Sequence, residues 1–167
     1  MINLARGEQA DLPPEVAARR RANLSLLSAA QEIFGVTQSA IGDYDPTKIP
    51  QELACTIVAL DIDGLSLWRD QPFTESLAAS DVGVVFLGGA WLEEDVFIAA
   101  LEAVRLGYDV RVLADLTVAR VEADRSLVLD RLALHGVLAT TVRQTLLEWA
   151  VCLDDPILKQ TVLQLLS

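Results

Sequence analysis

Two apolar runs, interrupted by one charged residue, Arg111, and separated by a segment with helical spacing, form the clearest pattern in the chain. Residues 82–87 and 110–114 are otherwise apolar without alternation, which is typical of strands that are buried on both faces. Between them, residues 93–106 place apolar side chains at helical intervals. Neighbouring parallel strands need a crossover of about a dozen residues, and this segment supplies one. The pattern therefore predicts a strand, a helix and a parallel strand, with both strands adjacent and central in their sheet.

The remaining segments alternate in type on both sides of this unit. Strands are expected at residues 36–41, 56–60 and 137–141, with a weak candidate at 2–12, and helical segments at 15–34, 50–53, 71–79, 122–134, 143–153 and 156–166. This alternation predicts an α/β fold, a three-layer doubly wound parallel sheet of about five or six strands, in a single domain spanning residues 1–167. Ligands of such sheets bind beyond the carboxyl ends of the strands, here near residues 88–95 and 115–119.

The high apolar content does not indicate a membrane protein. Hydrophobic residues make up 52% of the chain, yet no apolar run approaches the roughly 20 residues that a membrane span needs. The first residues carry charges where a secretory signal has an apolar core, so we expect a cytoplasmic protein. Cys55 and Cys152 stand in no redox or metal-binding spacing and are expected to be buried as small hydrophobes.

The charge balance disfavours one class of partner and leaves another open. The net charge is −11, from 24 acidic and 13 basic residues, whereas binding of nucleic acid relies on clustered lysine and arginine. The one basic run, residues 19–21, is interpreted as a solvated helix start. Apolar surface on a protein of modest charge is often covered by a second copy. We therefore expect a homo-oligomer, a dimer or larger, with residues 144–166 contributing to a two-fold interface.

The motifs of the chain do not indicate a cofactor site, a metal site or a Ser-His-Asp triad. Gly88 and Gly89 precede a helix, but no GxGxxG pattern or P-loop lysine accompanies them, so no cofactor is expected. His135 is the only histidine and stands before Gly136 at a predicted helix end, which disfavours a metal site and a Ser-His-Asp triad.

Carboxylates are the remaining candidates for chemistry. The acids at residues 93–95 are interpreted first as residues that stabilise a helix start through its dipole. Four aspartates fall near predicted strand ends or turns, and two sharing a cleft would raise a carboxylate pKa enough for acid/base work. These four are Asp61, Asp63, Asp95 and Asp115.

A longer motif runs through the central unit. A glycine, Gly89, is followed after five residues by Asp95 and Val96, then by the small pair Ala99 and Ala100, and then by the strand segment 107–116, GYDVRVLADL. This arrangement resembles the isochorismatase-like cysteine hydrolases, most of all the subgroup with the MAR1-type and YcaC-like proteins. That family has Cys-Val at the helix start and a Gly-Tyr-x-Val-x-Val strand. The resemblance implies the isochorismatase-like hydrolase fold.

The catalytic residues that the resemblance implies are replaced. Family members hydrolyse amides and related bonds with a cysteine, a lysine and an aspartate of the first strand. Asp95 stands at the cysteine position, Asp61 lies near the lysine position, and the first-strand aspartate would fall near Gly7, with Gln9 after it. Lys48 and Lys159, the only lysines, lie elsewhere in the chain. Any pocket is expected around Gly89, Ala90, Trp91 and Asp115.

Two functional hypotheses follow from this replacement. In the first, the fold has lost its catalytic triad and serves binding, assembly or regulation. In the second, the chain is an active hydrolase of a small amide or isochorismate-like substrate that uses a carboxylate in place of the thiol. A small-molecule ligand is compatible with either. The hypotheses differ in whether Asp95, Asp61 or Asp63, and Asp115 converge in one pocket.

Overall fold

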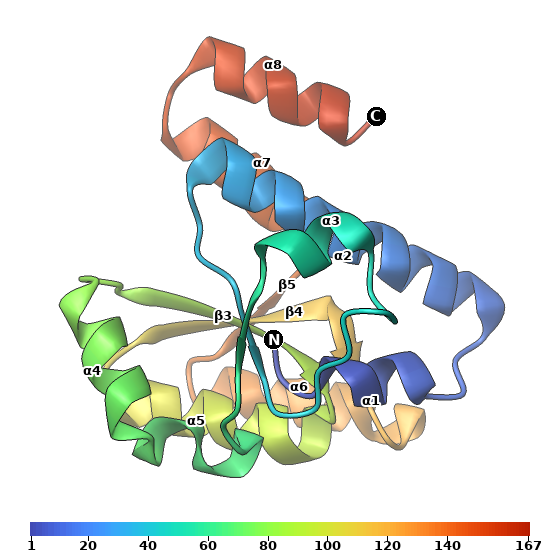
Figure 1. Ribbon diagram of the computed structural model, residues 1–167, viewed down its shortest axis with the longest axis vertical. Coiled ribbons are helices and arrows are strands. Elements are labelled where there is room, and N and C mark those ends of the chain that lie inside the picture. Colours follow the sequence, from blue (N-terminus) through green and yellow to red (C-terminus); the bar gives the residue numbers. More distant parts are fainter.

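The computed structural model describes all residues, 1–167, and has parallel strands throughout (Figure 1). The two ladders run in the orders β1-β2 and β3-β4-β5. Ile2 forms an isolated parallel bridge to Ile41 on one side and to Gly89 on the other, and so joins the two ladders. The strands are β1 (Ser39–Ile41), β2 (Val58–Leu60), β3 (Val84–Ala90), β4 (Asp109–Val118) and β5 (Leu138–Thr140).

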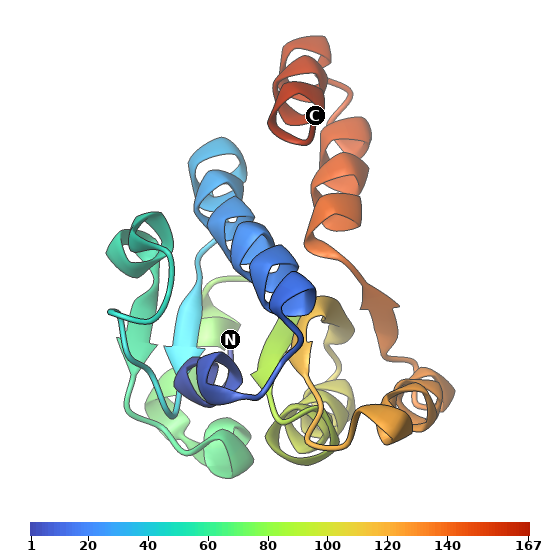
Figure 2. The same ribbon diagram turned by 90° about the vertical axis from the view of Figure 1, so that its right-hand side faces the viewer.

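Helices cover both faces of the strands, which gives the three layers seen in Figure 2. Buried residues of α2, α3, α7 and α8 form one apolar cluster, and those of α5 and α6 with the turn η1 form the other. The helices are α1 (Leu4–Gln9), α2 (Pro14–Phe34), α3 (Gln51–Thr56), α4 (Gln71–Ala79), α5 (Phe97–Arg105), α6 (Arg125–Leu134), α7 (Val142–Cys152) and α8 (Pro156–Leu165). Three short helical turns are η1 (Gly64–Arg69), η2 (Leu92–Val96) and η3 (Glu122–Asp124).

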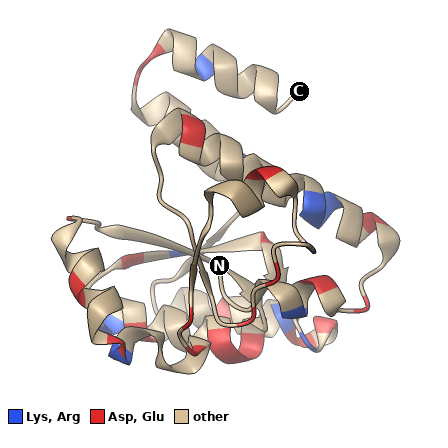
Figure 3. Cartoon of the chain, viewed as in Figure 1, with Lys and Arg blue, Asp and Glu red and all other residues tan.

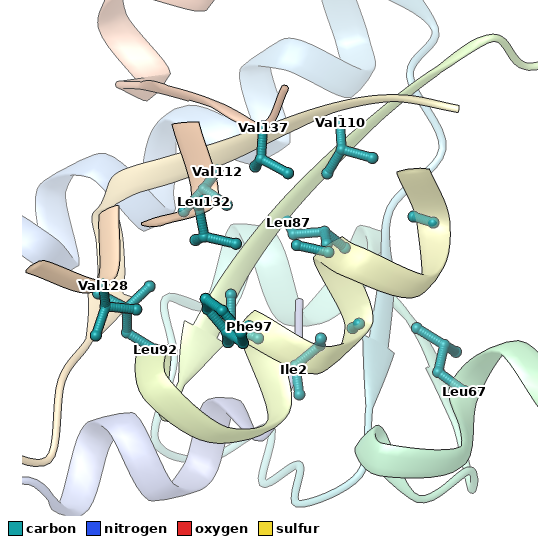
Figure 4. Close-up of a cluster of buried hydrophobic side chains, with 14 of the residues drawn as sticks. Ile2, Leu67, Leu87, Leu92, Phe97, Val110, Val112, Val128, Leu132 and Val137 are labelled. Carbon is teal, nitrogen blue, oxygen red and sulfur yellow. The ribbon is translucent and has the colours of Figure 1, made fainter. Parts of the chain in front are cut away.

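The central unit has the predicted strand, helix and parallel strand. β3 pairs with β4 in parallel, with Val84 opposite Asp109 and Leu87 opposite Val112. α5 packs three alanines, Ala99, Ala100 and Ala103, into the core with no exposed surface. Small side chains let a helix approach a sheet closely, and large apolar residues fill the remaining space around them (Figure 4). The adjacent parallel pairing is confirmed, whereas the predicted central position is wrong for β3, which lies at the edge of its ladder.

The sheet differs from the expectation at its first segment. The expected strand at residues 2–12 is wrong, because only Ile2 pairs with neighbouring strands and residues from Leu4 onward form α1. Asn3 makes the transition with left-handed backbone angles, φ 48° and ψ 48°. β3 is consequently at the edge of the three-stranded ladder instead of inside a continuous sheet, and only Ile2 covers its free side.

Two expectations about single side chains are also wrong. Cys55 and Cys152 are both exposed, because they lie on the outer faces of α3 and α7. Arg20, in the middle of the basic run, is 4% exposed and pairs with Glu8, while its neighbours in the run are exposed. Burial lowers the pKa of Arg20 to about 10.

Figure 3 shows lysine and arginine dispersed over several helices, with acidic residues among them. No helix is both long enough and apolar enough to cross a membrane.

Candidate functional site

The segments that follow Ile2, β1 and β3 lie close together at the carboxyl ends of the strands. Gly89 is held there by a close backbone contact, since a Cβ on it would lie 1.8 Å from the carbonyl oxygen of Ile2. Its φ of 126° is also one that side-chain-bearing residues rarely adopt. The glycine thus allows Ile2 to donate to the Gly88 carbonyl (2.8 Å) and to accept from the Ala90 amide (2.9 Å). This role in strand pairing accounts for the glycine pair without a bound phosphate.

Asp95 lies behind this edge, in the wide helical turn η2 that leads into α5. It is 4% exposed, and its carboxylate packs against Gly64, where an added Cβ would lie 3.1 Å from Oδ1. The other oxygen, Oδ2, is 3.7 Å from Nη1 of Arg6. Arg6 in turn donates from Nε to Oδ2 of Asp43 at 2.5 Å. The Asp95 carboxylate is therefore buried beside the Arg6 guanidinium, which also pairs with the Asp43 carboxylate.

Asn3, from the amino-terminal segment, lies beside Asp43 and so joins the cluster of Arg6, Asp43 and Asp95. It is 2% exposed, and its Oδ1 accepts a hydrogen bond from the Asp43 amide at 2.9 Å. Its Nδ2 is buried and has no hydrogen-bond partner. Asn3, not Gly7, follows the residue that pairs with β1 and β3, whereas Gly7 lies within α1 against the Arg20 guanidinium. The signal that could have found Asn3 was the apolar pair Met1-Ile2 followed by a short polar residue.

Arg6 links the two carboxylates electrostatically. The hydrogen bond to Asp43 is the largest cause of a raised pKa for Arg6, with further contributions from the charges of Asp43, Asp95 and Glu94. The guanidinium therefore remains charged at any physiological pH. Sequence reasoning missed Arg6 because its partners lie 37 and 89 positions away along the chain.

The other candidate aspartates do not join Asp95. Asp61 is exposed after β2. Asp63 is exposed and caps η1, where it accepts from the Leu65 amide (3.4 Å) and the Ser66 hydroxyl (3.0 Å). Asp115 accepts from the amide of Val142 at the start of α7, at 3.1 and 3.2 Å, and burial raises its pKa. The four candidate aspartates therefore do not converge in one pocket.

The two acids before Asp95 connect the turn η2 to the segment that follows β4. Glu94 forms two hydrogen bonds with the Arg120 guanidinium, at 2.8 and 3.0 Å, and these lower the pKa of Glu94. Glu93 accepts from the amides of Arg120 and Val121, at 2.8 and 3.1 Å. The Arg120 guanidinium also lies 4.7 Å from the ring centre of Trp91. The acids stand in the first turn of η2, where the helix dipole favours them, although no side chain caps the turn; Glu93 and Glu94 make this cross-link in addition.

Two cavities lie away from Asp95. One, of about 490 Å³, is lined by residues of α2 and the end of β4 and includes Asp115 and Arg125. The other, of about 830 Å³, is mostly apolar and lies between β1 and β3. Of the residues expected around a pocket, Asp115 lines a cavity, whereas Gly89, Ala90 and Trp91 line neither of the two. No group of three or more His, Cys, Asp or Glu side chains is placed to hold a metal ion.

The chain is similar to known proteins in sequence and in fold. No family model matches the chain. Isochorismatase domain-containing protein 1 of Danio rerio is 29% identical over 122 residues, which cover 68% of this chain and 43% of that protein. The matched segment thus spans less than half of its curated relative's length.

Two solved structures share the fold. The YcaC gene product of Escherichia coli, an octameric hydrolase of unknown specificity, superposes with a TM-score of 0.75 at 19% identity, over 98% of this chain and 84% of YcaC. The MAR1 ribonuclease of Caenorhabditis elegans gives a TM-score of 0.73 at 20% identity, over 89% of this chain and 79% of that one. The chain therefore has the isochorismatase-like hydrolase fold, and the resemblance seen in its sequence is confirmed.

Proposed function

We propose that this chain is a non-hydrolytic protein with an isochorismatase-like fold, whose role is in binding and assembly. The observation that carries the proposal is the pairing of Asp95 with Arg6. A family member holds a reactive thiol at that place, with a lysine and an aspartate to activate it. Here a buried carboxylate faces a guanidinium that is itself bound to Asp43.

The chemistry of these groups supports a structural role. A carboxylate is a weak nucleophile unless a general base or an electrophilic centre assists it, and a neighbouring guanidinium lowers its reactivity further. Arginine does not act as a base because it stays protonated. The two lysines offer no replacement, since Lys48 pairs with Asp45 at 3.5 Å on the surface and Lys159 lies in α8. Asp61, nearest to the family's lysine position, carries the opposite charge and is exposed.

Exposed apolar residues support assembly as the other part of the proposal. Leu153 and Ile157, at the junction of α7 and α8, are 61% and 78% exposed, and Val151 and Leu163 are more than half exposed. α8 projects beyond the body of the molecule and packs on α7 (Figure 1). An apolar helical surface of this kind is commonly buried against a second copy. We place a self-association interface on α7 and α8, in keeping with the octameric state of YcaC.

The test of the non-hydrolytic role is restoration of the missing thiol. The Asp95→Cys variant should remain inactive on nicotinamide, isochorismate and simple carboxamides, because nucleophile, base and partner act as a unit. A thiol-labelling assay at this position, compared with the exposed Cys55 and Cys152, reports whether the new sulfur is reactive. Turnover by this single variant would show that the remaining residues still form a working site.

A further inference from the structure

One cavity lies apart from the cluster around Asp95 and brings three arginines together. It has a volume of about 490 Å³ and is lined by Arg19 and Arg20 from α2 and by Arg125 from the start of α6. The whole chain has only 11 arginines and two lysines, against 24 acidic residues. Three arginines around one cavity are therefore a local concentration of positive charge in an acidic protein.

The donors of Arg125 are used within the fold. Its Nη1 and Nη2 donate to the Thr117 carbonyl at 3.1 and 3.0 Å, and Nη2 also donates to the Ala114 carbonyl. Its Nε lies 3.6 Å from a carboxylate oxygen of Glu122. Arg125 thus fixes the end of β4 as one wall of the cavity and leaves no donor for a ligand.

Arg20 differs, because one edge of its guanidinium has no partner. Its Nη1 donates to Glu8, whereas Nε and Nη2 are buried without a hydrogen-bond partner. A Cβ added to Gly7 would lie 2.7 Å from this Nη2 and 3.5 Å from a methyl group of Val118, which also lines the cavity. The unpaired edge of Arg20 therefore lies at the wall of the cavity.

This edge has a specific binding chemistry. The Nε–H and one N–H of Nη2 point in parallel, so they match the two oxygens of a carboxylate in a bidentate pair. Buried donors without an acceptor are costly, and an acceptor that reaches them from the cavity would remove that cost. The Arg20 side chain is 4% exposed, so the pair would form out of contact with bulk water, where it is stronger.

The other lining residues favour a ligand with a single negative charge and an apolar part. Glu15, Asp115 and Glu122 also line the cavity, and three acidic groups would repel a multiply charged anion such as phosphate. A short hydrocarbon chain has apolar surface to contact. This surface comes from the four hydrophobic lining residues, Leu12, Val16, Ala114 and Val118.

We propose that this cavity binds a small monocarboxylate with a short alkyl chain. Its carboxylate pairs with the Nε and Nη2 edge of Arg20, and the alkyl chain packs on Val16 and Val118. Arg19, exposed on the same helix, adds a second positive charge beside the cavity. The site does not include Asp95, so the inference goes beyond the role proposed above and stands whether or not the chain hydrolyses a substrate.

Titration of the full chain with sodium butyrate, followed by the NMR signal of the Arg20 Nε–H, tests the site. Butyrate at millimolar concentration should shift this signal, while sodium chloride at the same ionic strength should not. Arg20→Lys keeps the charge but loses the bidentate edge, and it should weaken butyrate binding at least about tenfold. Arg21→Lys is the matched control, because Arg21 is exposed and does not line the cavity, and it should bind butyrate as the unmodified chain does.

A second pair of variants decides the question if Arg20→Lys does not fold. Val16 is 49% exposed, so Val16→Glu should fold and should weaken butyrate binding severalfold by placing a negative charge at the cavity, whereas Ala17→Glu, one position along, should not. An unshifted Arg20 signal would overturn the proposal, because water alone would then satisfy this edge. Equal affinity in Val16→Glu and Ala17→Glu, or tighter binding of inorganic phosphate than of butyrate, would overturn it as well.

Discussion

The Cα of Gly89 lies so close to Ile2 that a Cβ at that position would be 1.8 Å from the Ile2 carbonyl oxygen. The contact is between two backbones and cannot be relieved by a side-chain rotation. Ile2 joins the two strand ladders, because it bridges Gly89 at one side and Ile41 at the other. Gly89 is thus a structural requirement of the sheet, although its sequence context suggested a ligand-binding turn.

Replacement of this glycine tests that relationship. Gly89→Ala should lower the free energy of unfolding by at least about 3 kcal/mol, from the clash together with a φ of 126°. Gly35→Ala is the matched control, because Gly35 also has a positive φ but nothing lies within 4 Å of its added Cβ. The control should cost only about 1 kcal/mol. Equal losses in chemical denaturation would mean that the contact with Ile2 is unimportant.

The pairing of Arg6 with Asp95 should contribute to stability. Arg6→Met leaves the buried Asp95 carboxylate without its cation, and we expect a loss of about 1–2 kcal/mol, limited because the Arg6 side chain is 43% exposed. Asp95→Asn in the same background should recover part of this loss. A double-mutant cycle measures the coupling, and a coupling energy near zero would show that the two groups do not interact.

Burial of the Met1 ammonium predicts a pH dependence for a chain that begins with a free amino group there. Its pKa is about 5 when folded and 8.0 ordinarily, so between these values the unfolded chain binds more protons. The free energy of unfolding should therefore rise with pH from about 5 to 8 and level off above 8. The gain is at most a few kcal/mol by linkage. An amino-terminally acetylated chain should lack this component, and identical pH profiles for both forms would contradict the assignment.

The apolar surface of α7 and α8 predicts a variant that separates the copies. Ile157→Glu places a charge on the most exposed large apolar side chain of that surface, and light scattering should then show the 18.1 kDa species. Leu134→Glu, on a residue that is 86% exposed at the end of α6, serves as control and should leave the larger species intact. An unmodified chain that scatters only as 18.1 kDa at micromolar concentration would rule out the interface.

The sequence could predict those parts of the fold that rest on local pattern. β3, α5 and β4 were predictable because strands buried on both faces are apolar throughout and a helix has a period of its own. The first segment was not, because the strand position of Ile2 depends on the edges of β1 and β3, which are distant in sequence. Asp95 could be singled out by its place in the motif. Its partner could not, since the pattern around Arg6 indicates nothing about Asp43 or Asp95.

The local sequence pattern also could not predict which single polar residues are buried. Three consecutive arginines point in different directions from a helix, and which of them turns inward depends on the packing of α1 against α2. In the structure that residue is Arg20, which lies over Gly7 and pairs with Glu8. Glycine at position 7 leaves the room that the guanidinium occupies.

Hydrolysis by the purified, unmodified protein is the most direct test of the central claim. Nicotinamide, isochorismate and simple carboxamides should be turned over no faster than by a heat-killed control, because Asp95 is held by Arg6 and no thiol or lysine accompanies it. Asp95→Asn should give the same background rate. Turnover above the control that disappears in Asp95→Asn would contradict the account and establish a carboxylate mechanism in its place.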